Sequence, residues 1–219
     1  MILLVSGGHS RHRSGVVGDL IVPGSGNTPV GIWAADNGAF SGFDESMFLA
    51  MLERLEPYRE TCLFVACPDV VGDASATLDL FHEWAPQLVR EQWPLALVAQ
   101  DGLEADAVPW RVIDALFIGG TTEFKLSSEA AGLVRLAKHH NKWVHMGRVN
   151  TIRRMVYANS IGVDSIDGTS FSRWSDIYIP RAVRMLPHQQ LPLEQPEMSP
   201  PRHYIEGVLG SEKERGRYT

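Results

Sequence analysis

The sequence is poor in cysteine, in long apolar runs and in positive charge, and each shortage excludes a class of protein. Its 219 residues include two cysteines, Cys62 and Cys67, an odd number of positions apart in one apolar run. On a strand the two side chains would point to opposite faces and could not pair. This excludes a disulfide scaffold and a cysteine-rich zinc site, and it favours a reducing cytoplasm.

No apolar run reaches the ~18 residues that a membrane-spanning helix needs, and none has the flanks of a signal peptide. Lys and Arg number 20 against 26 Asp and Glu, a net charge of −6. This balance is unfavourable for a protein that coats nucleic acid by bulk charge, although it permits a local basic surface. We expect a cytoplasmic globular protein, and no membrane partner.

Short apolar bursts recur along the chain, and each is followed by a polar or glycine-containing step. We interpret as buried parallel strands the bursts at 2–5, 30–35, 62–66, 95–99, 115–118, 143–146 and 163–166. Helical spacing and capping residues predict helices over 44–59, 74–90, 127–140 and 151–159.

Repeated strand–helix alternation predicts a parallel α/β architecture. A chain of 219 residues suits a compact TIM-type (β/α)8 barrel, either irregular or with seven clear strands. A doubly wound open sheet is the alternative, but no Gly-x-Gly-x-x-Gly follows the first strand, which weakens a dinucleotide-binding version.

Two segments do not fit the alternation. Residues 11–28 are rich in Gly and Ser and form either an extra strand or a loop over the barrel mouth. Five prolines over 187–201 make regular structure unfavourable there. We therefore predict a catalytic barrel domain over 1–186, followed by a Pro-rich arm and a charged tail over 187–219.

A carboxylate, an amide or a bare glycine follows nearly every predicted strand. In a parallel barrel the carboxyl ends of the strands converge on one face, where the active sites of this fold lie. Each of these groups is also typical of a simple turn, so the prediction depends on their convergence. The groups are Ser6-Gly7-Gly8-His9, Asp36-Asn37-Gly38, Cys67-Pro68-Asp69, Gln100-Asp101-Gly102, Gly119-Gly120-Thr121, His145-Met146-Gly147-Arg148 and Asp167-Gly168-Thr169.

A metal site is an alternative reading of the same strand ends. Its ligands would come from His9, His12, Asp36, His145 and Asp167. Arg11 and Arg13 flank the His-x-x-His segment, and their positive charge opposes a divalent cation. We therefore expect no metal and no cofactor.

Five segments in order along 30–174 carry a resemblance to a known family. They are Ala35-Asp36-Asn37-Gly38-Ala39-Phe40, Ala99-Gln100-Asp101-Gly102, Ile118-Gly119-Gly120, His145-Met146-Gly147 and Gly162-Val163-Asp164-Ser165-Ile166-Asp167. Together they resemble the tRNA-guanine transglycosylase family, and most of all its short phage and bacterial relatives that insert 7-deazaguanines into DNA. Members of this family are TIM barrels that exchange guanine in a polynucleotide for a deazaguanine base.

The resemblance implies a role for each matched residue. Asp167 would be the nucleophile, and Asp36 would act on the base. The resemblance also implies three kinds of contact to the base. Phe40 and Met146 would stack on its two faces, and Asp69 and Gln100 would form hydrogen bonds to its edge. The backbone N–H groups of Gly119 and Gly120 would bind its carbonyl oxygen.

Nucleic-acid contacts are expected from basic residues near the strand ends. Arg173 lies six residues beyond Asp167, where the family carries an arginine that contacts nucleic acid. The further candidates, of which we expect about half at the barrel mouth, are Arg11, Arg13, Lys125, Arg148, Arg153 and Arg154.

The sequence departs from the family at two places. The family's third-strand aspartate falls one position away from Asp69, and its Cys/His zinc site is missing. Since that zinc region helps the tRNA enzymes to hold their polynucleotide, the departure favours DNA over tRNA.

Three functions remain open from the sequence. The first is a transglycosylase that exchanges guanine in DNA or tRNA for a free 7-deazaguanine base through a covalent aspartyl-glycosyl intermediate, with a homodimer plausible from the family. The second is an N-glycoside hydrolase that acts on a guanine-like nucleoside or nucleotide. The third is a non-catalytic nucleobase-binding subunit.

Overall fold

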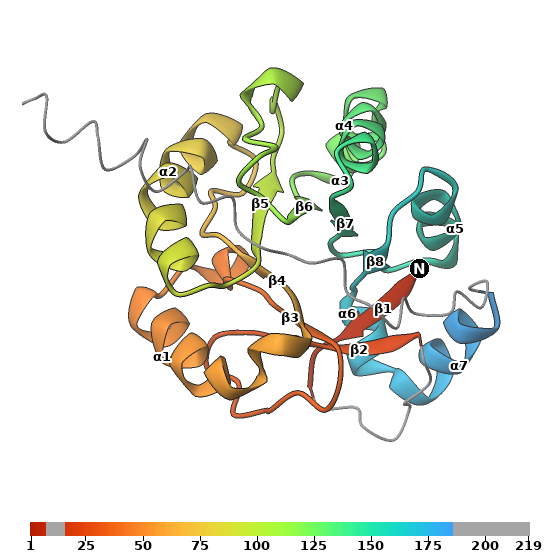
Figure 1. The fold of residues 1–219 in the computed structure, drawn as a ribbon. Coiled ribbons are helices and arrows are strands. Elements are labelled where there is room, and N and C mark those ends of the chain that lie inside the picture. The colour runs from red at the N-terminus through yellow and green to blue at the C-terminus, as the bar shows by residue number, and fades with distance from the viewer. Residues whose placement is uncertain (8–15, 186–219) are drawn as a thin grey trace, which may run out of the picture.

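The computed structural model describes residues 1–7 and 16–185. Its parallel strands close into a barrel in which each strand pairs with its neighbour in sequence and β8 pairs with β1 (Figure 1). The strands are β1 (Ile2–Val5), β2 (Val17–Ile21), β3 (Trp33–Ala35), β4 (Cys62–Ala66), β5 (Leu95–Ala99), β6 (Ala115–Ile118), β7 (Trp143–Met146) and β8 (Ser165–Ile166). The predicted TIM-type barrel is confirmed, and the open sheet is excluded.

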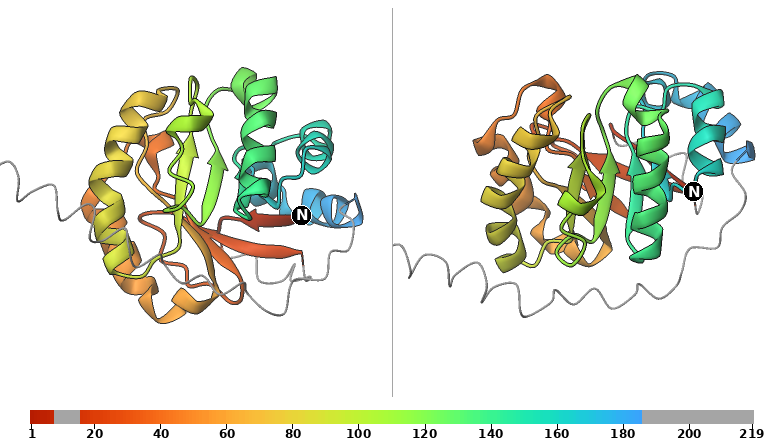
Figure 2. Two further views of the ribbon diagram at one scale, coloured as in Figure 1. Left: turned by 45° about the horizontal axis from the view of Figure 1, so that its top comes forward. Right: turned by 90° about the horizontal axis from the view of Figure 1, so that it is seen from above.

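Helices lie outside the strands, as the further views show (Figure 2). The α-helices are α1 (Glu45–Leu55), α2 (Ala74–Arg90), α3 (Thr122–Lys125), α4 (Ser128–His139), α5 (Ile152–Ser160), α6 (Thr169–Arg173) and α7 (Ser175–Met185). Short 3-10 helices are η2 (Ala39–Ser41), η3 (Glu56–Thr61) and η4 (Ala105–Ala107). The four predicted helices therefore correspond to α1 with η3, α2, α4 and α5.

Side-chain caps fix where several of these helices begin. Asp44, Asp73, Ser127 and Thr151 each accept a hydrogen bond from a backbone N–H in the first turn of α1, α2, α4 and α5, respectively. Each cap satisfies a backbone donor that would otherwise lack an intrahelical partner, which fixes the residue at which the helix begins.

The second strand decides between the two alternatives that the sequence left open for residues 11–28, an extra strand or a loop. Residues 17–21 form β2, a full member of the barrel between β1 and β3, and residues 22–32 connect β2 to β3 without a helix. The barrel therefore has the eight strands of the predicted (β/α)8 architecture, the seven clear strands of the sequence and β2. Gly18 belongs in this strand because an added Cβ would lie 2.8 Å from the carbonyl oxygen of Ile32 and 3.0 Å from Leu4.

The strands separate two apolar layers. One layer fills the barrel and includes Leu4, Phe64, Val98 and Phe117, whereas the larger layer lies between the strands and the helices. Since side chains alternate along a strand, register decides which layer each residue joins. Asp164, for example, lies outside the barrel, where it pairs with Lys138 at 2.6 Å.

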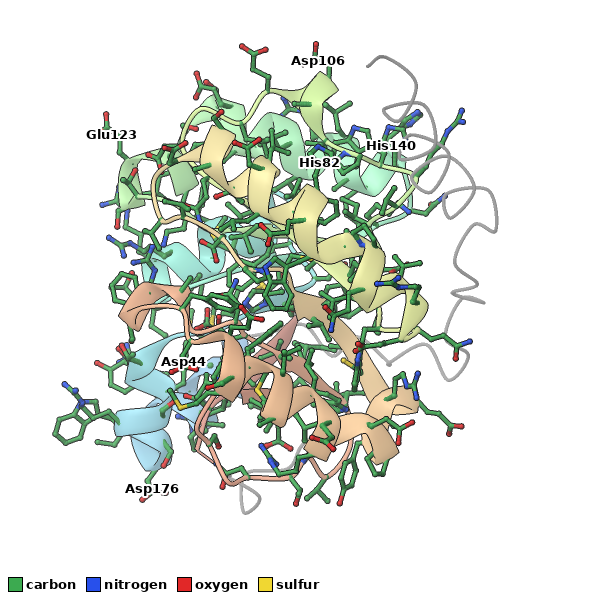
Figure 3. The ribbon with its side chains drawn as sticks, turned by 90° about the vertical axis from the view of Figure 1, so that its left-hand side faces the viewer. Asp44, His82, Asp106, Glu123, His140 and Asp176 are labelled. Carbon is green, nitrogen blue, oxygen red and sulfur yellow. The ribbon has the colours of Figure 1, made fainter. Side chains whose placement is uncertain are left out.

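In Figure 3 the carboxyl ends of the strands lie toward the left and their amino ends toward the right, as the residues at the helix ends show. Asp44 at the start of α1 and Glu123 in α3 both follow strand ends, and both lie toward the left in Figure 3. His140, which follows the last residue of α4, lies on the right. Among the described residues, no helix is long and apolar enough to cross a membrane.

Candidate functional site

A cavity of about 650 Å³ lies at the carboxyl ends of the strands. Its volume falls in the range of roughly 300–1,000 Å³ that is usual for small-molecule sites. Residues that follow β3, β4, β5, β6, β7 and β8 line it together. Among them are the predicted site residues Asp36, Phe40, Asp69, Gln100, Gly119, Gly120, Arg148 and Asp167.

Asp36 directly follows β3, and its carboxyl is enclosed by the cavity wall. Its Oδ1 accepts a hydrogen bond from the N–H of Gly38 at 3.2 Å. Burial raises the pKa of Asp36 from its ordinary value of 3.8 to about 6, and the negative charge of Asp167 adds to that increase. A carboxyl group with a pKa near 6 is suited to donate and accept protons near neutral pH.

Asp167 follows β8, and its side chain is 18% exposed, toward the cavity. Its Oδ1 accepts a 2.6 Å hydrogen bond from the backbone N–H of Arg148. The close approach requires glycine at position 147, since an added Cβ would lie 2.5 Å from the ring of Phe117 and 3.4 Å from Asp167 Oδ1. The end of β7 therefore holds this carboxylate in place.

His145 lies below Asp167 inside the barrel and is fully buried. Its Nδ1 lies 2.9 Å from Ser165 Oγ, and that hydroxyl also accepts a 2.8 Å hydrogen bond from the indole N–H of Trp143. The Nε2 of His145 has no hydrogen-bond partner within the described residues and lies 3.5 Å from Asp167 Oδ1.

The contact between Ser165 Oγ and Nδ1 favours the tautomer of His145 that carries its proton on Nε2. An indole N–H can only donate, so the Ser165 hydroxyl hydrogen is available for Nδ1, which leaves the proton on Nε2. The Nε2–H then faces Asp167. His145 was expected from the sequence as a candidate metal ligand and as part of the strand-end group His145-Met146-Gly147-Arg148, but its contact with Asp167 was not predicted. Strand alternation, which puts His145 and Gly147 on the same face of β7, could have indicated it.

Asp69 and Gln100, the expected readers of the guanine edge, are bonded to each other. Gln100 Nε2 donates to Asp69 Oδ2, and Asn37 Nδ2 donates to Asp69 Oδ1 at 2.6 Å. Gln100 Oε1 accepts from the N–H of Gly72 at 2.8 Å. Burial raises the pKa of Asp69, against the lowering effect of these amide donors. The polar edge is thus a connected network, in which Asn37, named from the sequence only as part of a strand-end group, joins the two predicted edge readers.

The two glycines after β6 differ in what they can offer a ligand. The N–H of Gly119 donates to the carbonyl of Ala99 at 2.9 Å, so it belongs to the sheet and does not serve a base carbonyl as the resemblance implied. Gly120 has a φ of 71°, a conformation that glycine adopts without strain. An added Cβ at Gly120 would also collide with Asp101 and Phe124.

Phe40 and Arg148 meet across the cavity mouth. The guanidinium carbon of Arg148 lies 4.3 Å from the centre of the Phe40 ring. Arg148 Nη2 also donates to the carbonyl of Gly120 at 2.6 Å. The aromatic face that was predicted to stack on a base is therefore covered by a cation in this structure.

Two predicted site residues lie away from the cavity. Met146 is 2% exposed and packs in the layer between strands and helices, because it alternates with the inward-facing His145. It therefore does not cover a base face. Arg173, the last residue of α6, is exposed and does not line the cavity.

Several residues of the sequence prediction lie outside the described residues: His9, Arg11, His12, Arg13 and the arm and tail over 187–219. Within the described ranges, no group of three or more His, Cys, Asp or Glu side chains is arranged to hold a metal ion. Cys62 and Cys67 are both buried free thiols.

The chain is a TIM-type barrel protein with a polar, carboxylate-bearing cavity at the carboxyl ends of its strands. No protein-family model matches the chain. No curated protein matches it either.

Two solved structures illustrate its structural similarities. The first is the PaMucR phosphodiesterase in a c-di-GMP complex, at 17% identity and a TM-score of 0.38; the match covers 64% of this chain and 65% of that one, less than two thirds of its length. The second is oxaloacetate acetylhydrolase in complex with the product oxalate, at 16% identity and a TM-score of 0.38, covering 84% of this chain and 68% of that one. At this level, neither similarity bears on the activity of this chain.

Proposed function

We propose that the protein is a nucleobase transglycosylase that exchanges guanine in a polynucleotide for a 7-deazaguanine base. The observation that carries the proposal is that Asp36 and Asp167 line one cavity and interact electrostatically, with the pKa of Asp36 raised to about 6. Two carboxyl groups in such different environments suit a proton donor and a nucleophile. The preference for DNA over tRNA rests on the sequence resemblance alone.

In the first half of the reaction, an oxygen of Asp167 forms a bond to C1′ of the target nucleotide. The bond from C1′ to N9 of guanine breaks, and its electron pair leaves with the base. Asp36 gives its proton to the departing guanine, which leaves as a neutral molecule. The products of this half are free guanine and a glycosyl ester on Asp167.

In the second half, N9 of the incoming base attacks C1′ while the ester bond to Asp167 breaks. Asp36, now ionised, takes the proton from N9, and Asp167 returns as a carboxylate. The two halves restore the charge and protonation of both side chains, so neither an oxidant nor a metal enters the balance. Division into two steps lowers the barrier relative to direct displacement.

The polar network and the cavity mouth suit recognition of a base. The carboxylate of Asp69 can accept from the N1–H and exocyclic amine of guanine if Asn37 or Gln100 gives up its bond to it. The Arg148 guanidinium must leave the Phe40 ring before a base can stack there. Base binding therefore exchanges two sets of internal contacts for contacts to the ligand.

The direct test is incorporation of radiolabelled guanine or a labelled 7-deazaguanine into DNA and into tRNA. The wild type should incorporate label, and Asp167→Ala should reduce incorporation by at least 10³-fold, because no glycosyl ester can form. Asp79→Asn, on the exposed side of α2, is the matched control and should retain wild-type incorporation. Denaturing electrophoresis should show a polynucleotide adduct in the wild type and none in Asp167→Ala.

The same assay separates the competing functions. Release of guanine without incorporation would identify a hydrolase. Binding of guanine without release or incorporation would identify a non-catalytic subunit. Undiminished exchange by Asp167→Ala would rule out the covalent mechanism.

A further inference from the structure

Opposite walls of the cavity differ in charge. Asp36 and Asp69 follow β3 and β4 on one wall. Three cations, Lys125, Arg148 and Arg154, line the wall that is formed by α3, the end of β7 and the first turn of α5. An anionic group of a ligand would be repelled by the first wall and attracted by the second.

Lys125 is the innermost of the three cations. It is the last residue of α3 and only 5% exposed, an uncommon position for a lysine. Its Nζ donates to the carbonyl of Gly147 at 3.2 Å, next to the residue whose N–H holds Asp167. No carboxylate of the described residues lies within salt-bridge distance of it. Two of its three N–H donors therefore remain for a ligand.

The electrostatics of Lys125 agree with this geometry. Burial, together with the positive charges of Arg148 and Arg154, lowers its pKa from the ordinary value of 10.5 to about 8. Asp167 and Asp101 act in the opposite direction but do not outweigh the other causes. The main cause of the lower pKa is burial, so a bound anion beside Lys125 would favour its charged form.

The two arginines extend the positive wall toward solvent. Both are partly exposed, and Arg148 uses its guanidinium on Gly120 and on the Phe40 ring. Among the described residues, the Arg154 guanidinium forms no hydrogen bond or ion pair, while its backbone N–H is capped by Thr151. A group held by Lys125 could therefore reach Arg154 without breaking an existing contact of that side chain.

We propose that Lys125, Arg148 and Arg154 form an oxyanion subsite that binds a phosphate group of the substrate beside Asp167. The subsite deepens the proposed function, on which the identity of the phosphate rests: it would be a phosphate of the nucleotide whose base is exchanged. Binding it would fix the sugar relative to the nucleophile, since charge-assisted hydrogen bonds to phosphate are short and directional.

Binding of guanosine 5′-monophosphate and of guanosine, measured by calorimetry, tests the subsite without any turnover. The wild type should bind the nucleotide at least tenfold more tightly than the nucleoside. Lys125→Met and Arg154→Met should each reduce this ratio severalfold, and Lys125→Arg should retain part of it. Arg153→Met is the matched control, because Arg153 is an exposed neighbour on α5 that does not line the cavity, and it should leave the ratio unchanged.

A second readout concerns Lys125 itself. In protein labelled with ¹³C-lysine, the Lys125 signal should titrate near pH 8, and saturating inorganic phosphate should raise that midpoint, because a bound anion favours the ammonium form. Three results would each overturn the proposal. The wild type could bind guanosine 5′-monophosphate and guanosine equally, or the ratio of the two affinities could be unchanged in both Lys125→Met and Arg154→Met. The third is a Lys125 titration midpoint that phosphate does not move. Arg154 is partly exposed, so Arg154→Met should fold normally. It therefore tests the subsite even if Lys125→Met, at a buried position, fails to fold.

The outcome is independent of base exchange. A phosphate-dependent ratio in a protein that exchanges no base would retain the subsite and reject the proposed function. A protein that exchanges bases but binds guanosine and its monophosphate equally would retain the proposed function and reject the subsite.

Discussion

The Nε2 of His145 lies 3.5 Å from Oδ1 of Asp167, a residue that lines the cavity. The imidazole is enclosed by Phe64 and Phe117, whose ring centres lie 5.2 and 4.5 Å from its own. Its other nitrogen contacts Ser165, which in turn receives the indole N–H of Trp143. A chain of polar contacts that begins at Trp143, on the same inward face of β7 as His145, thus ends at the proposed nucleophile.

We expect His145→Gln to slow base exchange by about 10–100-fold while KM for the base changes little. A neutral N–H that faces Asp167 stabilises its carboxylate as the group that leaves in the second half of the reaction, without contacting the base. Ser165→Ala, which removes only the hydroxyl that orients the imidazole, should have the same kind of effect at smaller size. A rise in KM with unchanged kcat would show that His145 acts on base binding instead.

Asp36→Asn should stabilise the protein near neutral pH. The pKa of Asp36 rises from 3.8 to about 6 on folding, so the folded state holds its proton more tightly than the unfolded state. That contribution to stability is complete below about pH 4 and is lost as pH rises through about 6. Asp36→Asn has no carboxyl to ionise at this position and so keeps its stability over that pH range. Its free energy of unfolding should therefore exceed that of the wild type by a margin that grows with pH to at most about 3 kcal/mol. Chemical unfolding at pH 4 and pH 7 measures both differences.

Gly147→Ala and Gly132→Ala should have opposite effects on stability. A methyl group at Gly147 would lie 2.5 Å from the Phe117 ring, and relief of that overlap should cost about 1–3 kcal/mol and displace Asp167. Gly132 lies in α4, and an added Cβ there would make only an ordinary 3.7 Å contact with Arg135. Gly132→Ala should therefore gain about 0.5–1 kcal/mol. Denaturant midpoints compare the two variants, and equal midpoints would contradict the packing described for β7.

Asp69→Asn should weaken discrimination between guanine and hypoxanthine, which lacks the exocyclic amine. The carboxylate offers only acceptors to that amine, whereas a carboxamide brings a competing donor. We expect the wild type to favour guanine by at least tenfold and the variant to lose most of that preference, as judged by competition for base exchange. Unchanged discrimination would place the reading of the amine elsewhere in the cavity.

The barrel was largely predictable because its strands and helices carry local signals. The helix over 74–90 matches α2 residue for residue, since Asp73 caps its first turn and its apolar positions follow the helical period. The strand β2 was predicted only as one of two alternatives for residues 11–28, the other being a loop over the barrel mouth. Gly18 and Asp19 interrupt its apolar pattern, and its place depends on pairing with β1 and β3, which no local signal reports.

The candidate site was predictable only in part, for a related reason. Asp36 and Asp167 directly follow Ala35 and Ile166, which face the outer layer, so side-chain alternation turns both aspartates toward the cavity. Residues within a strand depend on register, and the register of β7 turns His145 inward and Met146 outward. The burial of Lys125 depends on how α3 packs over the end of β7, which sequence spacing alone does not specify.

The main chain and the side chain of Arg148 make different contacts. The N–H anchors Asp167, whereas the guanidinium reaches Phe40 and Gly120 at the mouth. Every residue except proline supplies that N–H, and the φ of 58° is adopted readily by asparagine, aspartate and glycine. Diversity at this one codon can therefore remodel the entrance while the Asp167 carboxylate below it keeps its anchor, which makes position 148 the natural starting point for changing which ligands the cavity admits.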